Sequence, residues 1–154
     1  MFRSNKASIL ELVEVRKIVE TAIVELAAHR ATAKDLRAIR ATIDAARQSV
    51  EAGDLKYGPH SAAFHSALAR AAKNRVLNLA VQSFRSFFSE ILQELLPTAA
   101  MAERAINDHT ALYHAIERHN HARARRLMSE HLAHVERIIM AFGESAFEDG
   151  GRTH

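Results

Sequence analysis

The spacing of apolar residues constrains the fold of this chain more than any other feature of its sequence. From about Ser8 to Arg30, apolar side chains recur every three or four residues, which places them on one side of an α-helix. The same spacing returns in five later segments, and helix-interrupting residues are scarce, with five glycines and two prolines among 154 residues. The sequence therefore predicts an all-α fold in which long helices pack their apolar sides together.

Capping residues and helix breakers divide the chain into six predicted helices. Thr32–Asp35 resembles a capping box, in which two side chains satisfy backbone N–H groups at a helix start. Gly53 suits the left-handed position that ends many helices, and Pro97 interrupts the chain. Gly143 is expected to end the last helix. The helices are predicted near residues 8–30, 32–52, 59–74, 75–96, 99–119 and 122–142.

Composition and charge exclude several classes of protein. The 21 lysines and arginines and the 18 acidic residues are interspersed, with a net charge of +3, so we do not predict direct DNA binding by this chain alone. The absence of cysteine excludes disulfides and thiolate metal sites. No apolar run approaches the roughly 18–20 residues that a membrane span needs, and no signal core follows the N-terminus. We therefore predict a soluble, cytoplasmic protein.

Three of the ten histidines lie where the helical period expects an inward apolar residue, at His65, His109 and His131. A single histidine of this kind is usually a core residue with a backbone or hydroxyl partner, and that interpretation stays open. Their occurrence on three helices indicates a shared task, which we predict is binding of a divalent metal ion. Neutral imidazole is a common ligand, and three of them leave positions open to water or an anion. Zinc and nickel both suit such a site.

Other residues are predicted to assist this site. His134 follows His131 by three residues, and His60 precedes the apolar stripe of the third helix, so both are candidate reserve ligands. Arg16 lies within the apolar stripe of the first helix, where a buried charge needs an anion. Glu20, one turn later, is one partner, and a bound acid is the other. Arg16 is therefore a candidate effector-binding residue.

Two other functions are compatible with this pattern. Three histidines with an open position could activate water in a metal-dependent hydrolase. Asp108 and Glu130, however, point about 100° away from the histidines that follow them, and no inward acidic residue is expected to serve as a general base. The sequence also lacks a glycine-rich phosphate loop and a serine nucleophile elbow, so we do not predict an enzyme. Phe84, Phe87 and Phe88 widen one apolar face, which favours a metal-free dimerisation module as the second alternative.

Several short motifs follow one another in a specific order. They are Glu14-Val15-Arg16 with Glu20 and Ala27-Ala28, then Gly53-Asp54, Phe64-His65-Ser66-Ala67-Leu68, Ala72-Lys73-Asn74, His109-Thr110-Ala111-Leu112, and Ala124-Arg125-Arg126-Leu127-Met128-Ser129-Glu130-His131-Leu132. Over roughly residues 9 to 142, this series resembles the FadR C-terminal (FCD) domain of GntR-family bacterial transcription regulators.

The resemblance implies an antiparallel bundle of six to seven helices that forms a homodimer. It also implies a divalent metal held by one aspartate and three histidines, with a small carboxylate effector at or beside the metal. By position, the three family histidines correspond to His65, His109 and His131. The family aspartate precedes the first histidine by four residues, where this chain has Ser61. A hydroxyl is a weaker ligand, which leaves four alternatives: Ser61 acts through water, His60 replaces it, the site binds metal more weakly, or the site is empty.

The resemblance also sets the expected domain organisation. Residues 1–8 are an N-terminal extension, residues 9–142 form the helical effector- and metal-binding domain, and residues 143–154 form a flexible tail. Family regulators carry a winged-helix DNA-binding domain ahead of this one, and none fits before the first predicted helix. The chain is therefore expected to be either a fragment of a regulator or a stand-alone sensor domain. In a full regulator we predict that it biases the conformation of attached DNA-binding domains.

Overall fold

A computed structural model of the chain describes the backbone of residues 6–54, 56–95 and 98–148, and the side chains of residues 9–54, 56–90 and 98–141. All regular structure in these ranges is helical, which confirms the predicted all-α class. The six helices are α1 (Lys6–Arg30), α2 (Ala33–Glu51), α3 (Tyr57–Ala71), α4 (Arg75–Leu95), α5 (Ala99–Glu117) and α6 (His121–Glu148).

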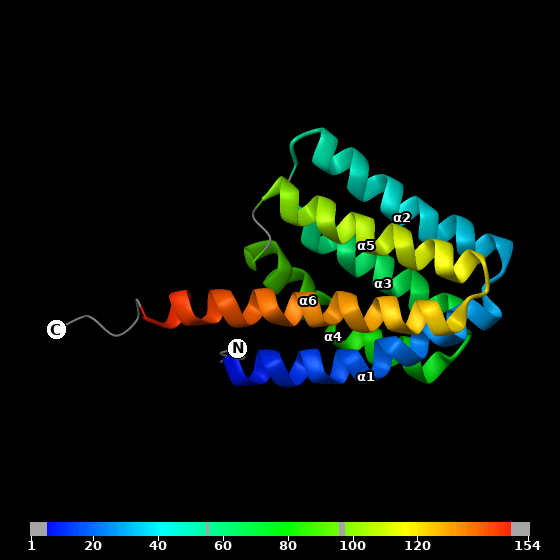
Figure 1. The fold of residues 1–154 in the computed structure, drawn as a ribbon, viewed down its shortest axis with the longest axis horizontal. Helices are drawn as coiled ribbons and strands as arrows, with labels where there is room; N and C mark the ends of the chain where they lie inside the picture. Colours follow the sequence, from blue (N-terminus) through cyan, green and yellow to red (C-terminus); the bar gives the residue numbers. More distant parts are fainter. Residues whose placement is uncertain (1–5, 55, 96–97, 149–154) are drawn as a thin grey trace.

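The helices form an antiparallel bundle (Figure 1). Helices α1 and α6 pack against each other along one side, and α2, α3 and α5 form the other side, with α4 packed on α3. Buried apolar side chains from all six helices fill the space between them. Because α3, α5 and α6 all contribute to this core, residues on their inward faces can meet although they are far apart in sequence.

The predicted helix ends agree with the structure at most positions. Asp35 N–H donates to Thr32 Oγ1 over 3.3 Å and Thr32 N–H donates to Asp35 Oδ2 over 2.8 Å, so the capping box is present. Gly53 has φ +77°, the left-handed conformation that glycine adopts without strain.

The predicted end of the last helix is wrong. Helix α6 continues through Gly143 to Glu148. A glycine inside a helix costs only about 1 kcal/mol relative to alanine, so it does not by itself stop a helix. The start of the predicted flexible tail is therefore helical, and residues 149–154 lie outside the described residues. At the other end α1 begins at Lys6, inside the predicted extension, and residues 1–5 also lie outside.

A glycine allows a close approach between α3 and α4. A Cβ atom added to Gly58 would lie 2.2 Å from the backbone carbonyl oxygen of Ser89, closer than atoms can pack. The two helices therefore touch through backbone at this point. This contact sets the position of the aromatic residues of α4 relative to the histidine of α3.

Over the part of α4 whose side chains are described, the apolar face is used mainly inside the bundle. Phe84 and Phe88 are buried and Phe87 is partly buried, whereas Val76 and Leu79 are exposed. The predicted apolar residues from Ile91 to Leu96 have side chains outside the described ranges. Among the helices of the described chain, none is both long and apolar enough to cross a membrane.

Candidate metal and ligand site

Three helices bring their buried histidines to one point. His65 of α3, His109 of α5 and His131 of α6 have exposed fractions of 4%, 2% and 5%. One ring nitrogen from each lies within 4.8 Å of those of the other two. The spacing of ring centroids, between 5.0 and 5.6 Å, describes the same compact group. The structure thus brings together the three residues that the sequence singled out, and their role as metal ligands stays a prediction.

Each ring is held from outside by a contact at Nδ1. His131 Nδ1–H donates to the carboxylate of Asp108 over 3.1 Å, and His109 Nδ1 is hydrogen-bonded to the Tyr57 hydroxyl over 3.3 Å. A carboxylate partner requires the proton to lie on Nδ1, which leaves the lone pair on Nε2. Partners of this kind fix the tautomer and the orientation of metal-binding histidines.

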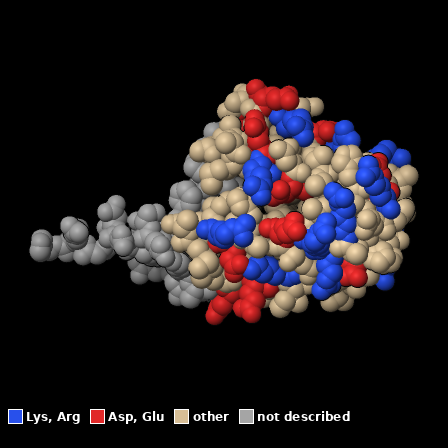
Figure 2. Space-filling view, viewed as in Figure 1, with Lys and Arg blue, Asp and Glu red and all other residues tan. Residues whose placement is uncertain are grey.

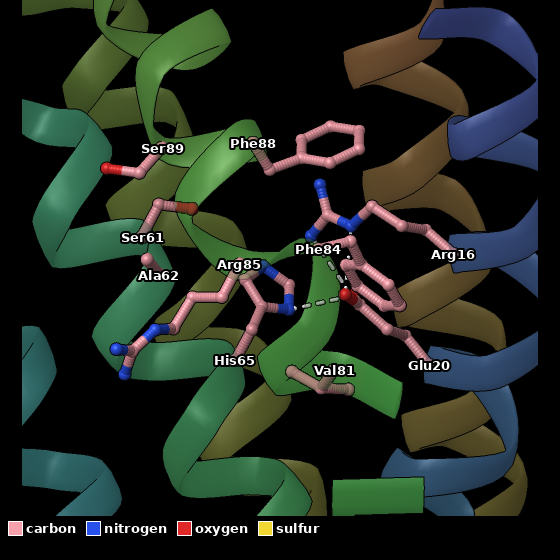
Figure 3. Close-up of a pocket in the computed structure, with 10 residues that line it drawn as sticks. All are labelled: Arg16, Glu20, Ser61, Ala62, His65, Val81, Phe84, Arg85, Phe88 and Ser89. Atoms are coloured by element: carbon pink, nitrogen blue, oxygen red, sulfur yellow. Dashed lines mark hydrogen bonds and ion pairs between the residues drawn. The ribbon is translucent and has the colours of Figure 1, made fainter. Parts of the chain in front are cut away.

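His65 is contacted by a buried carboxylate from α1. Glu20 Oε2 lies 2.8 Å from His65 Nδ1 (Figure 3). This close contact does not have the geometry of a hydrogen bond, and His65 Nδ1 has no hydrogen-bond partner among the described residues. The sequence assigned Glu20 only to Arg16 and expected no inward acidic residue near the histidines, and this expectation is wrong. Helix α1 crosses α3 at this level, which no spacing within one helix reveals.

Three ring nitrogens in the cluster lack a hydrogen bond from the protein. His65 Nδ1, His65 Nε2 and His109 Nε2 are buried without a hydrogen bond to any described residue. Buried unsatisfied polar atoms are destabilising and rare, so each needs an explanation. Three imidazole nitrogens within reach of one point form a donor set that suits zinc, nickel and similar ions better than magnesium or calcium, which prefer oxygen. The residues present therefore fit a divalent transition metal.

Burial favours the uncharged form of His65 and His109. Desolvation lowers the pKa of His65 to about 4, although the neighbouring charge of Glu20 acts in the opposite direction. Desolvation also lowers the pKa of His109 well below its usual value, and the nearby rings of His131 and His65 add to the effect. The neutral forms of His65 and His109 keep a free lone pair, which is the form of imidazole that binds a metal ion.

These pKa shifts predict a loss of stability in acid for the metal-free protein. The pKa of His65 is about 6.5 in the unfolded chain and about 4 in the fold, so between these values only the unfolded chain takes up the proton. The free energy of unfolding should fall by roughly 3 kcal/mol for this residue alone as the pH drops from 6.5 to 4. Urea denaturation at a series of pH values measures the free energy of unfolding. Equal values at pH 6.5 and 4.5 would contradict the lowered pKa of His65.

A buried ion pair lies beside the cluster. Arg16 Nε donates to Glu20 Oε1 over 2.9 Å and a terminal nitrogen of Arg16 donates to Glu20 Oε2 over 3.1 Å. The Arg16 guanidinium also stacks 4.0 Å from the ring centre of Phe88. Burial raises the pKa of Glu20, but Arg16 and His65 outweigh this and hold that pKa far below its usual range. The pairing of Arg16 with Glu20 is confirmed, and a role for Arg16 in binding an effector stays a prediction.

The other candidate ligands lie at different distances from the site. Ser61 is buried on α3, one turn before His65, and both residues line one small cavity between α1, α3 and α4. His60 and His134 are partly buried, and neither joins the group of ligand atoms that the described residues form. The structure therefore places Ser61 next to His65, whereas His60 and His134 lie outside the group of three ligand atoms.

A small cavity lies between α1, α3 and α4 next to His65 (Figure 3). We call it the inner cavity. Its volume is about 20 Å³. It is lined by Arg16, Glu20, Ser61, Ala62, His65, Val81, Phe84, Arg85, Phe88 and Ser89. This volume suits one water molecule or the head of one small polar group.

Charges on the surface are mixed rather than gathered. In the view of Figure 2, Lys and Arg side chains lie among Asp and Glu side chains across the helices. The interspersed pattern expected from the sequence is seen on this face. Such a surface contrasts with the single basic face that usually binds nucleic acid.

The chain resembles known transcription regulators in sequence and in fold. The family model for the FCD domain matches residues 11–134. The chain is 31% identical over 146 residues to the HTH-type transcriptional regulator LutR of Bacillus subtilis, covering 90% of this chain and 65% of that protein. It is 28% identical over 144 residues to the Uxu operon regulator of Haemophilus influenzae, covering 90% and 53%. The chain therefore spans less than two thirds of the length of these relatives.

Solved structures give the same result for the fold. A GntR protein of Streptococcus agalactiae superposes with a TM-score of 0.72 at 25% identity, covering 83% of this chain and 57% of that one. McbR/YncC of E. coli superposes with a TM-score of 0.74 at 18% identity, covering 89% and 66%. The second likeness shows the fold alone, because its sequence identity is low.

Proposed function

The chain belongs to the FCD domain family of GntR-type transcription regulators, and on that premise we propose that it senses an effector by binding a divalent metal ion and a small carboxylate. The two curated relatives are named as regulators and not as enzymes, which agrees with the prediction that this chain is not an enzyme. Attached DNA-binding domains and a homodimeric assembly are parts of the proposal.

The observation that carries the proposal is the convergence of three buried imidazoles. His65, His109 and His131 would hold the ion, because one ring nitrogen from each lies within 4.8 Å of the others. Asp108, Tyr57 and Glu20 contact the rings at Nδ1 and keep the opposite nitrogen directed away from these partners. When bound, the ion would supply a positive centre with open positions for an oxygen ligand.

The charge balance of the site favours an anionic effector. The candidate ligands are imidazoles, which bring no negative charge, and Ser61 stands where a carboxylate would cancel one unit of charge. Glu20 is already paired with Arg16, so its charge is largely compensated. A divalent ion in this setting keeps its positive charge, and the carboxylate of a small acid would balance it.

The site also explains how binding could reach the rest of a regulator. Its residues come from four helices, with Glu20 and Arg16 on α1, His65 on α3, His109 on α5 and His131 on α6. An acid that binds one packing of these helices more tightly than another shifts the population between them. A coupling free energy of about 1–3 kcal/mol is ordinary for such sensors.

Calorimetric titration tests the proposal with acetate as the probe. We expect acetate to bind the protein loaded with zinc or nickel, because the open metal position receives the carboxylate, and not to bind the metal-free protein. Acetamide, which has the same shape without the charge, is the matched control and should not bind either form. Equal binding of acetate with and without metal, or none in both states, would contradict the proposal.

A further inference from the structure

The hydroxyl of Tyr57 lies between a candidate metal ligand and a buried serine. Tyr57 and Ser61 are four residues apart on α3, which places them on the same side of that helix. The Tyr57 hydroxyl is hydrogen-bonded to His109 Nδ1 over 3.3 Å. The exposed fractions of Tyr57, Ser61 and His109 are 2%, 3% and 2%, so bulk solvent does not reach this group.

The Tyr57 hydroxyl has two possible partners for its proton. Burial raises the pKa of Tyr57, and a hydrogen bond with Ser61 acts in the opposite direction. A protonated phenol donates one hydrogen bond, and its oxygen can still accept another. His109 and Ser61 are the side chains that hydrogen-bond to this hydroxyl among the described residues. One of them therefore receives the Tyr57 proton, and the other can donate to the Tyr57 oxygen.

The direction of the Tyr57 O–H decides where His109 carries its ring proton. A neutral imidazole has a proton on one nitrogen and a lone pair on the other. If Tyr57 donates to Nδ1, the proton lies on Nε2, which then has no lone pair for a metal ion. If Tyr57 donates to Ser61, its oxygen accepts from Nδ1–H and Nε2 keeps the lone pair. Nε2 is buried without a hydrogen bond to any described residue, so it is the nitrogen left for the ion.

From these contacts, and resting on the proposed function, we propose that Ser61 is a positioning residue that acts on His109 through Tyr57. Ser61 accepts the hydrogen bond of the Tyr57 hydroxyl, the Tyr57 oxygen accepts from His109 Nδ1–H, and Nε2 stays free for the metal ion. The Phe64 ring stacks on the His109 ring, with centroids 3.8 Å apart and planes at 10°, and holds the plane in which Nε2 lies. Ser61 thus serves the site without binding the ion itself.

Nitrogen NMR of the metal-free protein, with isotope-labelled histidine, tests the proton position directly. In the unmodified protein at pH 7, the ring shifts of His109 should show the proton on Nδ1. In Ser61→Ala the Tyr57 hydroxyl keeps only His109 as a side-chain partner, so it should donate to Nδ1 and move the ring proton to Nε2. Ser61→Thr keeps a hydroxyl and should resemble the unmodified protein. A proton on Nε2 in the unmodified protein, or one that stays on Nδ1 in Ser61→Ala, would overturn the proposal.

Metal affinity separates a positioning role of Ser61 from direct ligation. Ser61→Ala and Tyr57→Phe should each lower the affinity for zinc about 10- to 100-fold, as loss of a residue that orients a ligand does. The double variant should lose no more than Tyr57→Phe alone, because Ser61 acts only through the Tyr57 hydroxyl. Ser66→Ala is the matched control, since Ser66 is buried on the same helix and its hydroxyl has no partner among the described residues. It should change the affinity less than about threefold.

The double variant also distinguishes failure of this assignment from failure of the proposed function. If Ser61→Ala costs as much affinity in the Tyr57→Phe protein as in the unmodified protein, Ser61 does not act through Tyr57. The assignment is then wrong while the proposed function stands. If the unmodified protein binds neither zinc nor nickel, the proposed function and the assignment of Ser61 both fail.

Discussion

Replacing His131 with glutamine should lower the affinity of the protein for zinc or nickel by more than about 100-fold. Loss of a residue that merely orients a ligand lowers metal affinity about 10- to 100-fold, and loss of a ligand itself should exceed that. His131 is 5% exposed and its ring is fixed by Asp108, so no solvent-exposed side chain can readily take its place. Competition against a chromogenic chelator measures the affinity.

His134→Gln is the matched control for this substitution. His134 lies on the same helix, three residues after His131, but it does not belong to the cluster of ligand atoms. Its replacement should leave the metal affinity within about threefold of the unmodified value, since it is neither a ligand nor a residue that orients one. Equal losses of metal affinity in the two variants would contradict the assignment of His131 as a metal ligand.

Replacing Glu20 with glutamine should lower the free energy of unfolding by about 3–5 kcal/mol, because it leaves the buried Arg16 guanidinium without its counter-charge. Arg16 and Glu20 are 3% and 2% exposed, so bulk solvent does not reach the guanidinium that loses its partner. The same substitution removes the carboxylate next to His65 Nδ1, which adds to the disturbance. Urea denaturation of the metal-free protein at pH 7 measures the change.

The exposed pair Arg126–Glu130 supplies the control for burial. It has the same four-residue spacing on a helix, but its side chains are 68% and 64% exposed. Glu130→Gln should therefore have little effect on unfolding. The double variant Arg16→Met with Glu20→Leu should recover much of the stability lost in Glu20→Gln, since no buried charge remains unpaired. If Glu20→Gln and Glu130→Gln lowered the free energy of unfolding by similar amounts, the buried pair would contribute no more to stability than the exposed pair.

Features governed by local sequence could be predicted from the chain alone. The capping box at Thr32 and Asp35 involves residues three apart, and the left-handed glycine at Gly53 depends on its own backbone. The inward direction of His65, His109 and His131 follows from the period of each helix taken separately. Arg16 and Glu20 are one turn apart, so their pairing was also within reach.

Contacts between helices could not be predicted in the same way. The contacts of Glu20 with His65 and of Tyr57 with His109 depend on how helices rotate and cross, which the period within one helix does not determine. Asp108 points away from His109 on its own helix, yet its carboxylate reaches His131 on the neighbouring helix.

X-ray absorption at the zinc or nickel edge, on the loaded protein with and without acetate, measures the coordination directly. We expect three imidazole nitrogens at ~2.0–2.1 Å for zinc, with an oxygen ligand whose signal changes when acetate is added. Loss of one imidazole in His131→Gln would accompany this result. A spectrum of oxygen ligands alone, or one with a single imidazole that His131→Gln leaves unchanged, would contradict a metal centre built from these three histidines.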